Sequence, residues 1–272
     1  MTGWVKFLLY TFALTWFVGI ILVIPLAAIE GLLKLPEDSI SNLAAKYGPT
    51  LGGFVTMYAL QGRSGAWALL RKGLRWKVGI QYYLFALLVP IIIKLPALYL
   101  LNIDFTLNSW SPNILHASLS AFATHFFLGG GLGEEFGWRG TMLPLMKDEF
   151  KLFTTTLILA FFWALWHMPA FIFADKGTTE PIMAFLVVVV AASFIMSWLY
   201  FETRQSVLIL AIFHAMINAS GKIFAASTDV TTEQLQTYAF YWNEALILLV
   251  LAVIILVLSL NQFLTLTNST KT

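Results

Sequence analysis

Long apolar stretches, separated by short polar segments, dominate the chain. Each stretch is close to the ~20 residues that a helix needs to cross a hydrocarbon core about 30 Å thick. The stretches cover residues 5–29, 43–61, 80–101, 113–133, 153–173, 181–201, 205–221 and 242–262. The seventh is the weakest, because it is short and contains His214, Asn218 and Ser220. The pattern predicts an all-α fold, a polytopic membrane bundle of about eight transmembrane helices.

The apolar stretches continue from one end of the chain to the other without an internal repeat or a second soluble region. We therefore expect a single transmembrane domain over residues 1–272, with a motif-bearing core at about 113–221. The first apolar run follows Lys6 and extends to about Ala28. That length favours a retained span over a cleaved signal peptide.

Composition supports a membrane protein. Hydrophobic residues make up 59% of the chain and charged residues 11%, whereas an ordinary soluble domain has roughly 25% charged residues. Lipid must therefore cover much of the surface. The chain has no cysteine, which excludes thiol nucleophiles and thiolate metal sites. A formal net charge of +2 gives no indication of nucleic-acid binding.

The basic residues indicate an orientation. With both termini inside, eleven of the sixteen lysines and arginines fall on the cytoplasmic side and five on the other. This bias favours cytoplasmic termini, and we expect a multi-pass protein of a prokaryotic cell membrane. The segment 63–77 alternates basic residues with Trp67, Leu70, Leu74 and Trp76. It is read either as a topology-setting loop or as a short amphipathic helix on anionic lipid.

Three groups of polar residues lie in or beside the apolar spans. An ionisable side chain costs at least ~2.5 kcal/mol to insert, so each group calls for a reason. The groups are Glu134-Glu135-x-x-x-Arg139, Trp163-x-x-x-His167 and His214-x-x-x-Asn218. Each alone is typical of an ion pair or of packing. Together, on three helices and with complementary chemistry, they indicate one shared site.

Helical spacing distinguishes the two carboxylates. Glu135 and Arg139 are four residues apart, so they lie on one face and are expected to pair. Glu134 is rotated by ~100° and has Trp138, not a cation, four residues later. Glu134 is thus the carboxylate available for chemistry, and Glu135 is the structural one. The run Gly129-Gly130-Gly131-Leu132-Gly133 before it predicts either a backbone that brings Glu134 near the histidines or tight packing alone.

The other two groups supply histidines. His214 and Asn218 are also four residues apart and can direct hydrogen-bond donors at one point, as an oxyanion requires. Trp163 lies one turn before His167 and can fix the orientation of its ring. We expect Glu134, His167, His214 and Asn218 to share a cavity that opens toward the cytoplasm.

These residues admit several functions. Gly-x-Ser-x-Gly and His-Glu-x-x-His are both missing from the sequence. A glutamate and a histidine could activate water, with the His/Asn pair stabilising the oxyanion. Glu134, His167 and His214 could instead hold a divalent metal such as zinc. A non-catalytic immunity or binding protein, or a transporter with a proton relay, would use the same polar residues.

The three motifs, in this order and on separate spans, resemble those of the CPBP family. This family includes the type II CAAX prenyl proteases and bacteriocin-processing or self-immunity proteins. The resemblance covers residues from about Gly129 to Ser220. One departure is that the second motif usually begins with Phe, where this chain has Trp163. An aromatic ring is retained, so we expect a modest change in pocket shape.

The resemblance implies an intramembrane endopeptidase. By it, Glu134 and His167 would activate water and His214 with Asn218 would form the oxyanion hole. Glu135, Arg139 and Trp163 would support them. The family has been described both as metal-dependent and as a glutamate protease, so the metal stays open. The implied partners are the lipid bilayer and a peptide or lipidated protein substrate, of prenylated CAAX or bacteriocin type. The sequence defines neither the natural substrate nor an oligomeric state.

Overall fold

The computed structural model describes residues 1–18, 46–173 and 181–265. These residues form a bundle of helices without a β-strand, apart from one isolated bridge between Leu107 and Thr228. The all-α membrane bundle expected from the apolar pattern is confirmed.

The described residues form twelve α-helices. In chain order they are α1 (Gly3–Phe12), α4 (Gly48–Gly73), α5 (Ile80–Ile92), α6 (Lys94–Leu100), α7 (Pro112–Ala123), α8 (Gly130–Gly137), α9 (Leu143–Lys147), α10 (Leu152–Phe173), α12 (Ile182–Glu202), α13 (Val207–Ser227), α14 (Tyr238–Leu258) and α15 (Leu260–Leu264). Three π-helical segments, η1 (Ala13–Val18), η2 (Thr124–Leu128) and η3 (Trp138–Met142), and a 3-10 turn, η4 (Gln234–Gln236), complete the described elements.

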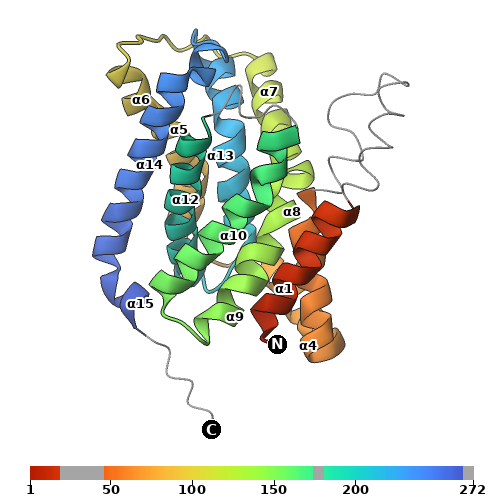
Figure 1. Ribbon diagram of the computed structural model, residues 1–272. Helices are drawn as coiled ribbons and strands as arrows, with labels where there is room; N and C mark the ends of the chain where they lie inside the picture. Colours follow the sequence, from red (N-terminus) through yellow and green to blue (C-terminus); the bar gives the residue numbers. More distant parts are fainter. Residues whose placement is uncertain (19–45, 174–180, 266–272) are drawn as a thin grey trace.

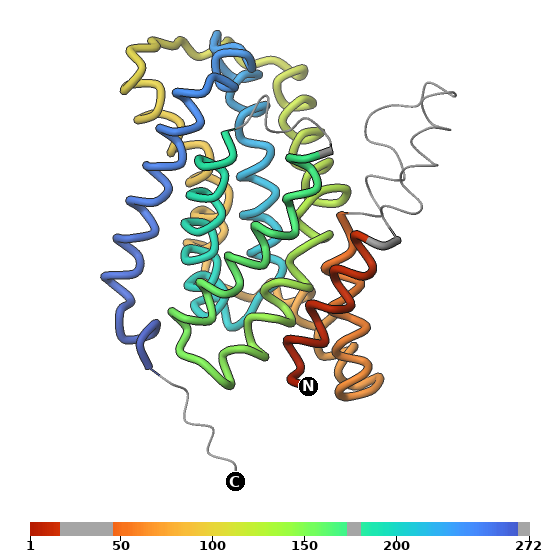
Figure 2. The backbone as a smooth tube through the Cα atoms, in the orientation of Figure 1, coloured from red at the N-terminus to blue at the C-terminus, as the bar shows by residue number. Residues whose placement is uncertain are grey.

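Helix α13 is central to the bundle. It contacts α5, α7, α8 and α12, and α12 in turn packs against α10 and α14. Helix α14 runs along one side of the molecule, while α1 and α4 pack together on the opposite side (Figure 1). The start of α1 and the end of α15 lie at the same end of the bundle (Figure 2). This agrees with an even number of crossings.

Five helical stretches in the described ranges are long and apolar enough to cross a membrane. They are Ile80–Leu100, Leu152–Ile172, Ile182–Glu202, Val207–Ser227 and Tyr238–Leu258. The expected count of about eight is therefore not reproduced over these ranges. The fourth of the five corrects the view that residues 205–221 form a short, weak span, because the helix continues for 21 residues. Part of the first predicted span, 5–29, lies outside the described residues.

One expected span is interrupted in the structure, and another is extended past its expected end. The stretch 113–133 divides at Gly129, whose extended backbone ends η2 and precedes α8. The stretch 43–61 continues to Gly73, with a non-helical Gly62 at φ 64°. Glycine adopts that conformation without a steric penalty, so the break falls where the side chain is smallest. The break at Gly129 sets α8, and with it both glutamates, in a separate short helix.

π-Helical segments bound α8 at both ends. The break at Gly129 separates it from η2, and η3 follows it without interruption. A π-helical turn accommodates an extra residue and is frequent at functional sites. Because helices of small residues approach closely, α8 packs tightly: a Cβ at Gly137 would lie 2.2 Å from the Pro49 carbonyl oxygen. Helix α8 is thereby fixed between α4 and α13.

Candidate active site

Helix α8 presents its two adjacent glutamates to different neighbours. Glu135 and Arg139 form the predicted ion pair, with 3.0 Å between Arg139 Nη1 and Glu135 Oε1, and both side chains are fully buried. The same Glu135 oxygen also lies 2.7 Å from His214 Nδ1. Since a carboxylate accepts, His214 donates from Nδ1 and its Nε2 faces the other way. Glu135 therefore orients a histidine as well as neutralising an arginine.

Glu134 is held by a different donor. The indole Nε1–H of Trp163 donates to Glu134 Oε2 over 2.7 Å. The Glu134 side chain is buried, with 4% of the residue exposed. The expectation that Glu134 avoids the Arg139 ion pair is thus met, and a neutral donor occupies one of its two oxygens.

Gly130 lies directly against Glu134 and His214. A Cβ built on Gly130 would lie 2.3 Å from His214 Nε2 and 2.8 Å from Glu134 Oε1. Both atoms therefore converge on one point beside Gly130, and only a glycine allows this close approach. Gly130 is four residues before Glu134 and so shares its helical face. The sequence contains this spacing. It does not decide whether the glycine run brings Glu134 near the histidines or only allows tight packing.

Trp163 links His167 to Glu134 and His214. The His167 Nδ1 lies 2.8 Å from the Trp163 carbonyl oxygen, so the proton is on Nδ1 and Nε2 is the basic nitrogen. The Trp163 ring also makes edge-on contacts with the rings of His167 and His214, at centroid distances of 5.8 and 5.6 Å. The expected role of Trp163 in orienting His167 is consistent with both contacts.

Asn218 differs from the expected arrangement. It lies on α13 one turn after His214, yet its side chain is exposed, while His214 is buried. Within the described ranges Asn218 makes no hydrogen bond to the other motif residues. Among the four residues expected to share a site, Glu134 and His214 are buried, His167 is partly buried and Asn218 is exposed. Asn218 lies one helical turn after His214, but its side chain is not covered by its neighbours.

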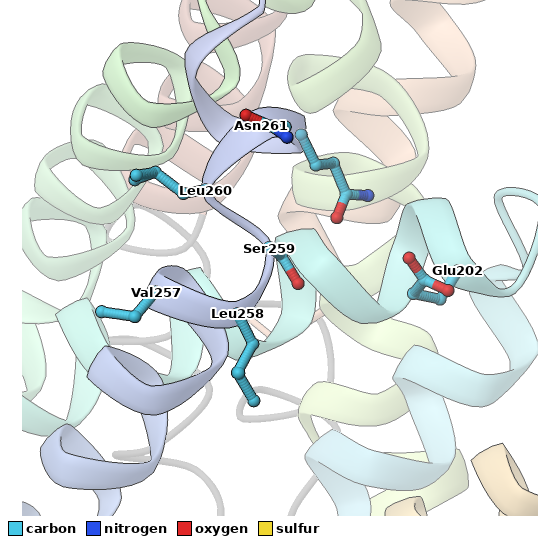
Figure 3. A pocket seen from close by; sticks show the side chains of 7 residues that line it. Glu202, Val257, Leu258, Ser259, Leu260 and Asn261 are labelled. Carbon is cyan, nitrogen blue, oxygen red and sulfur yellow. The ribbon is translucent and has the colours of Figure 1, made fainter.

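A surface hollow lies between the end of α12 and the junction of α14 with α15 (Figure 3). Glu202, Ser259, Asn261 and Gln262 supply its polar lining, and no motif residue contributes to it. Glu202 accepts a hydrogen bond from the Tyr82 hydroxyl over 3.1 Å. The hollow has no connection to the chemistry of the buried group. The expectation that the motif residues share a cavity open to the cytoplasm stays a prediction.

A metal ion would need several ligand side chains close together. Over the part of the chain that the structure describes, no group of three or more histidine or carboxylate side chains is gathered closely enough to hold one. Glu134 Oε2 and His214 Nδ1 already have protein partners. As arranged here, Glu134, His167 and His214 do not form a three-ligand site, so the chemistry below uses protein groups alone.

Comparison with known proteins agrees with the three motifs. Residues 116–220 match the family model described as type II CAAX prenyl endopeptidase Rce1-like. A protein of Methanococcus maripaludis named CAAX prenyl protease 2 is 27% identical over 124 residues. That alignment covers 43% of this chain and 45% of the relative, so the chain matches less than half of the relative's length. The matched segment contains all three motifs in order, so over residues 116–220 the chain is similar to the type II CAAX prenyl endopeptidases.

Proposed function

We propose that the chain is an intramembrane endopeptidase that hydrolyses a peptide bond of a membrane-associated substrate. The observation that carries the proposal is the convergence of Glu134 Oε1 and His214 Nε2 beside Gly130, while their other polar atoms are engaged. We propose that a water or a substrate carbonyl oxygen enters between these two atoms, at a position named the gap, where it would meet a base on one side and a donor on the other.

The residues fit a stepwise hydrolysis. Glu134 takes a proton from water as the water oxygen attacks the carbonyl carbon, and His167 Nε2 assists as a second base. His214, doubly protonated before the attack, donates from Nε2 to the oxyanion that forms, and Asn218 approaches as a further donor. Glu135 stabilises this imidazolium through Nδ1. The intermediate then collapses, and the departing amine receives the proton held by Glu134.

The name of the relative suggests the substrate class. A CAAX prenyl protease acts beside a lipidated cysteine, and a site within a membrane bundle suits a substrate held by a lipid anchor. We propose a prenylated CAAX-type peptide as the first substrate to test. A peptide of bacteriocin type without a lipid is the alternative.

The test uses the full chain reconstituted in vesicles, with a farnesylated and an unlipidated fluorogenic peptide. We expect Glu134→Ala and His167→Ala each to lower turnover by about 10²- to 10⁴-fold, the usual contribution of general acid–base catalysis. Glu202→Gln and His116→Ala are matched controls, because both side chains lie outside the motifs, and they should leave turnover unchanged.

The assay discriminates between the alternatives. Full activity in both motif variants would overturn the mechanism. No cleavage of either peptide by the unaltered chain would favour an immunity or binding role. An assay with and without a chelator tests metal dependence, and loss of turnover with the chelator would overturn a mechanism that uses protein groups alone.

A further inference from the structure

Trp163 contacts four of the polar residues of the three motifs. Its indole nitrogen donates to Glu134, its carbonyl oxygen accepts from His167, and its ring edge meets His214. The guanidinium carbon of Arg139 lies 4.0 Å from the centroid of the indole ring. The residue is 5% exposed. The Trp163 indole nitrogen is its one polar side-chain atom, and it points at the Glu134 carboxylate. Packing alone does not require this direction.

The contact with Arg139 strengthens this hydrogen bond. A cation over the face of an indole is attracted by the π electrons and draws them toward itself. The N–H at the ring edge then becomes a better donor, and hydrogen bonds to a charged acceptor are stronger than neutral ones. Arg139 thus acts on Glu135 by direct contact and on Glu134 through the ring of Trp163.

We propose that the Trp163 indole N–H is the positioning group for Glu134. By holding Oε2, it leaves Oε1 directed at the gap beside Gly130, where the proton is taken. This inference rests on the proposed function, in which Glu134 is the base. Trp163 does not touch the reacting atoms, so its loss should reduce turnover while leaving substrate binding largely unchanged.

The hydrogen bond can be measured without turnover. Labelling with ¹⁵N-tryptophan gives one indole N–H signal for each of the ten tryptophans, and Trp163→Phe identifies the signal of Trp163. We expect Glu134→Ala to move that signal upfield and to speed its exchange with solvent. An unmoved signal would overturn the hydrogen bond.

Two other tryptophans provide controls within the same spectrum. Trp4 donates its indole N–H to Glu149 over 3.0 Å, away from the site, so Glu149→Gln should move the Trp4 signal. Trp166 is buried on the same helix as Trp163, and among the described residues its Nε1 has no partner. Its signal should be unaffected by Glu134→Ala.

Kinetics then test the positioning role. Trp163→Phe keeps an aromatic ring and removes the N–H, and we expect kcat to fall by about 10- to 100-fold with KM within about twofold, as for loss of a hydrogen bond to a charged group. Trp4→Phe removes the same kind of hydrogen bond elsewhere and should leave kcat unchanged. An unchanged kcat in Trp163→Phe, with the hydrogen bond confirmed by its signal, would overturn the positioning role. Full activity in Glu134→Ala would instead overturn the proposed function.

Discussion

Glu134 and Glu135 are neighbours in sequence but have different chemical surroundings. Glu135 is held by a cation and a histidine, whereas Glu134 has a neutral indole donor and its second oxygen lies beside Gly130. The rotation of about 100° between consecutive helical residues is enough to produce this difference. One carboxylate is thereby fixed as a structural group, and the other keeps an oxygen directed toward the gap.

Gly130 is a position where an added side chain would disturb the candidate site directly. In Gly130→Ala the added methyl would lie 2.3 Å from His214 Nε2, so His214 or Glu134 must move. A displacement of about 1 Å can lower catalysis by about 10²-fold, and we expect a loss of that size in the cleavage assay.

Gly221→Ala is the matched control for this variant. Gly221 lies on α13 and has no atom within 4 Å of a built Cβ. Replacing a helical glycine by alanine should stabilise the protein by up to about 1 kcal/mol and leave activity intact. Full activity in Gly130→Ala would show that the gap is not where the reaction occurs.

Single residues differ in how far the sequence could place them. The Glu135–Arg139 pair follows from spacing within one helix, and the structure contains it. The hydrogen bond from Trp163 to Glu134 joins residues 29 positions apart on two helices, and no pattern in one sequence sets the register between helices. Asn218 shows a second limit. It lies four residues after His214, yet this spacing did not predict that His214 is buried and Asn218 exposed.

At the scale of elements, α1 and α4 approach through small residues. A Cβ on Gly52 would lie 2.4 Å from Thr11 Oγ1 and 3.0 Å from the Thr11 backbone nitrogen. Because the second contact is with backbone, a side chain at this position would push the two helices apart. Small residues at helix contacts are the usual means by which membrane helices pack closely.

Gly52→Ala should therefore destabilise the bundle. We expect a loss of about 1–3 kcal/mol in the free energy of unfolding, as for overpacking of a tight contact, measured by denaturant unfolding in detergent. Leu51→Ala, on the same helix but with a half-exposed side chain, is the control and should have a smaller effect. Equal stability of Gly52→Ala and the unaltered chain would mean that α1 adjusts freely.

Apolar length predicted helices well and interruptions poorly. The five long spans coincide with predicted stretches because continuous hydrophobicity is the signal that the bilayer requires. The break at Gly129 was not predicted, since a glycine run is equally typical of close packing. The sequence pattern ended this span at residue 221, whereas α13 continues to Ser227. The polar residues His214, Asn218 and Ser220 made the stretch look shorter than the helix is.

At the scale of the whole molecule, Lys72 links three segments. Its amine donates to the Gly140 carbonyl of η3 over 3.0 Å and to the Tyr200 hydroxyl of α12 over 2.9 Å. Burial, together with the positive charge of Arg75, lowers the pKa of the Lys72 amine to about 8 from an ordinary 10.5. The neutral amine can still donate both hydrogen bonds.

This shift makes stability depend on pH. Between pH 8 and 10.5 the unfolded chain keeps the proton on Lys72 that the folded chain has lost, so the folded state gains stability as the pH rises through this window. Below pH 8 both states are charged and the gain is absent. The thermal midpoint in detergent should therefore rise between pH 7 and 9.5 relative to that of Lys72→Met.

An exposed lysine supplies the control. Lys77 lies on the surface over the Trp76 ring, and Lys77→Met should follow the pH dependence of the unaltered chain. Parallel curves for the unaltered chain and Lys72→Met would contradict the assignment of this pH dependence to Lys72.

The π-helical segment η3 has a consequence for insertions and deletions. It joins α8 to α9 without a break, and a π-helical turn contains one residue more than the α-helical turn that would replace it. Deleting one residue of η3 would turn this wide turn into an ordinary α-helical one and would keep Glu134 and Glu135 in nearly the same rotation relative to α9. Deleting one residue from the regular part of α8 or α9 would instead rotate the glutamates by ~100°, so η3 is the place between the two helices where the chain tolerates a change of length.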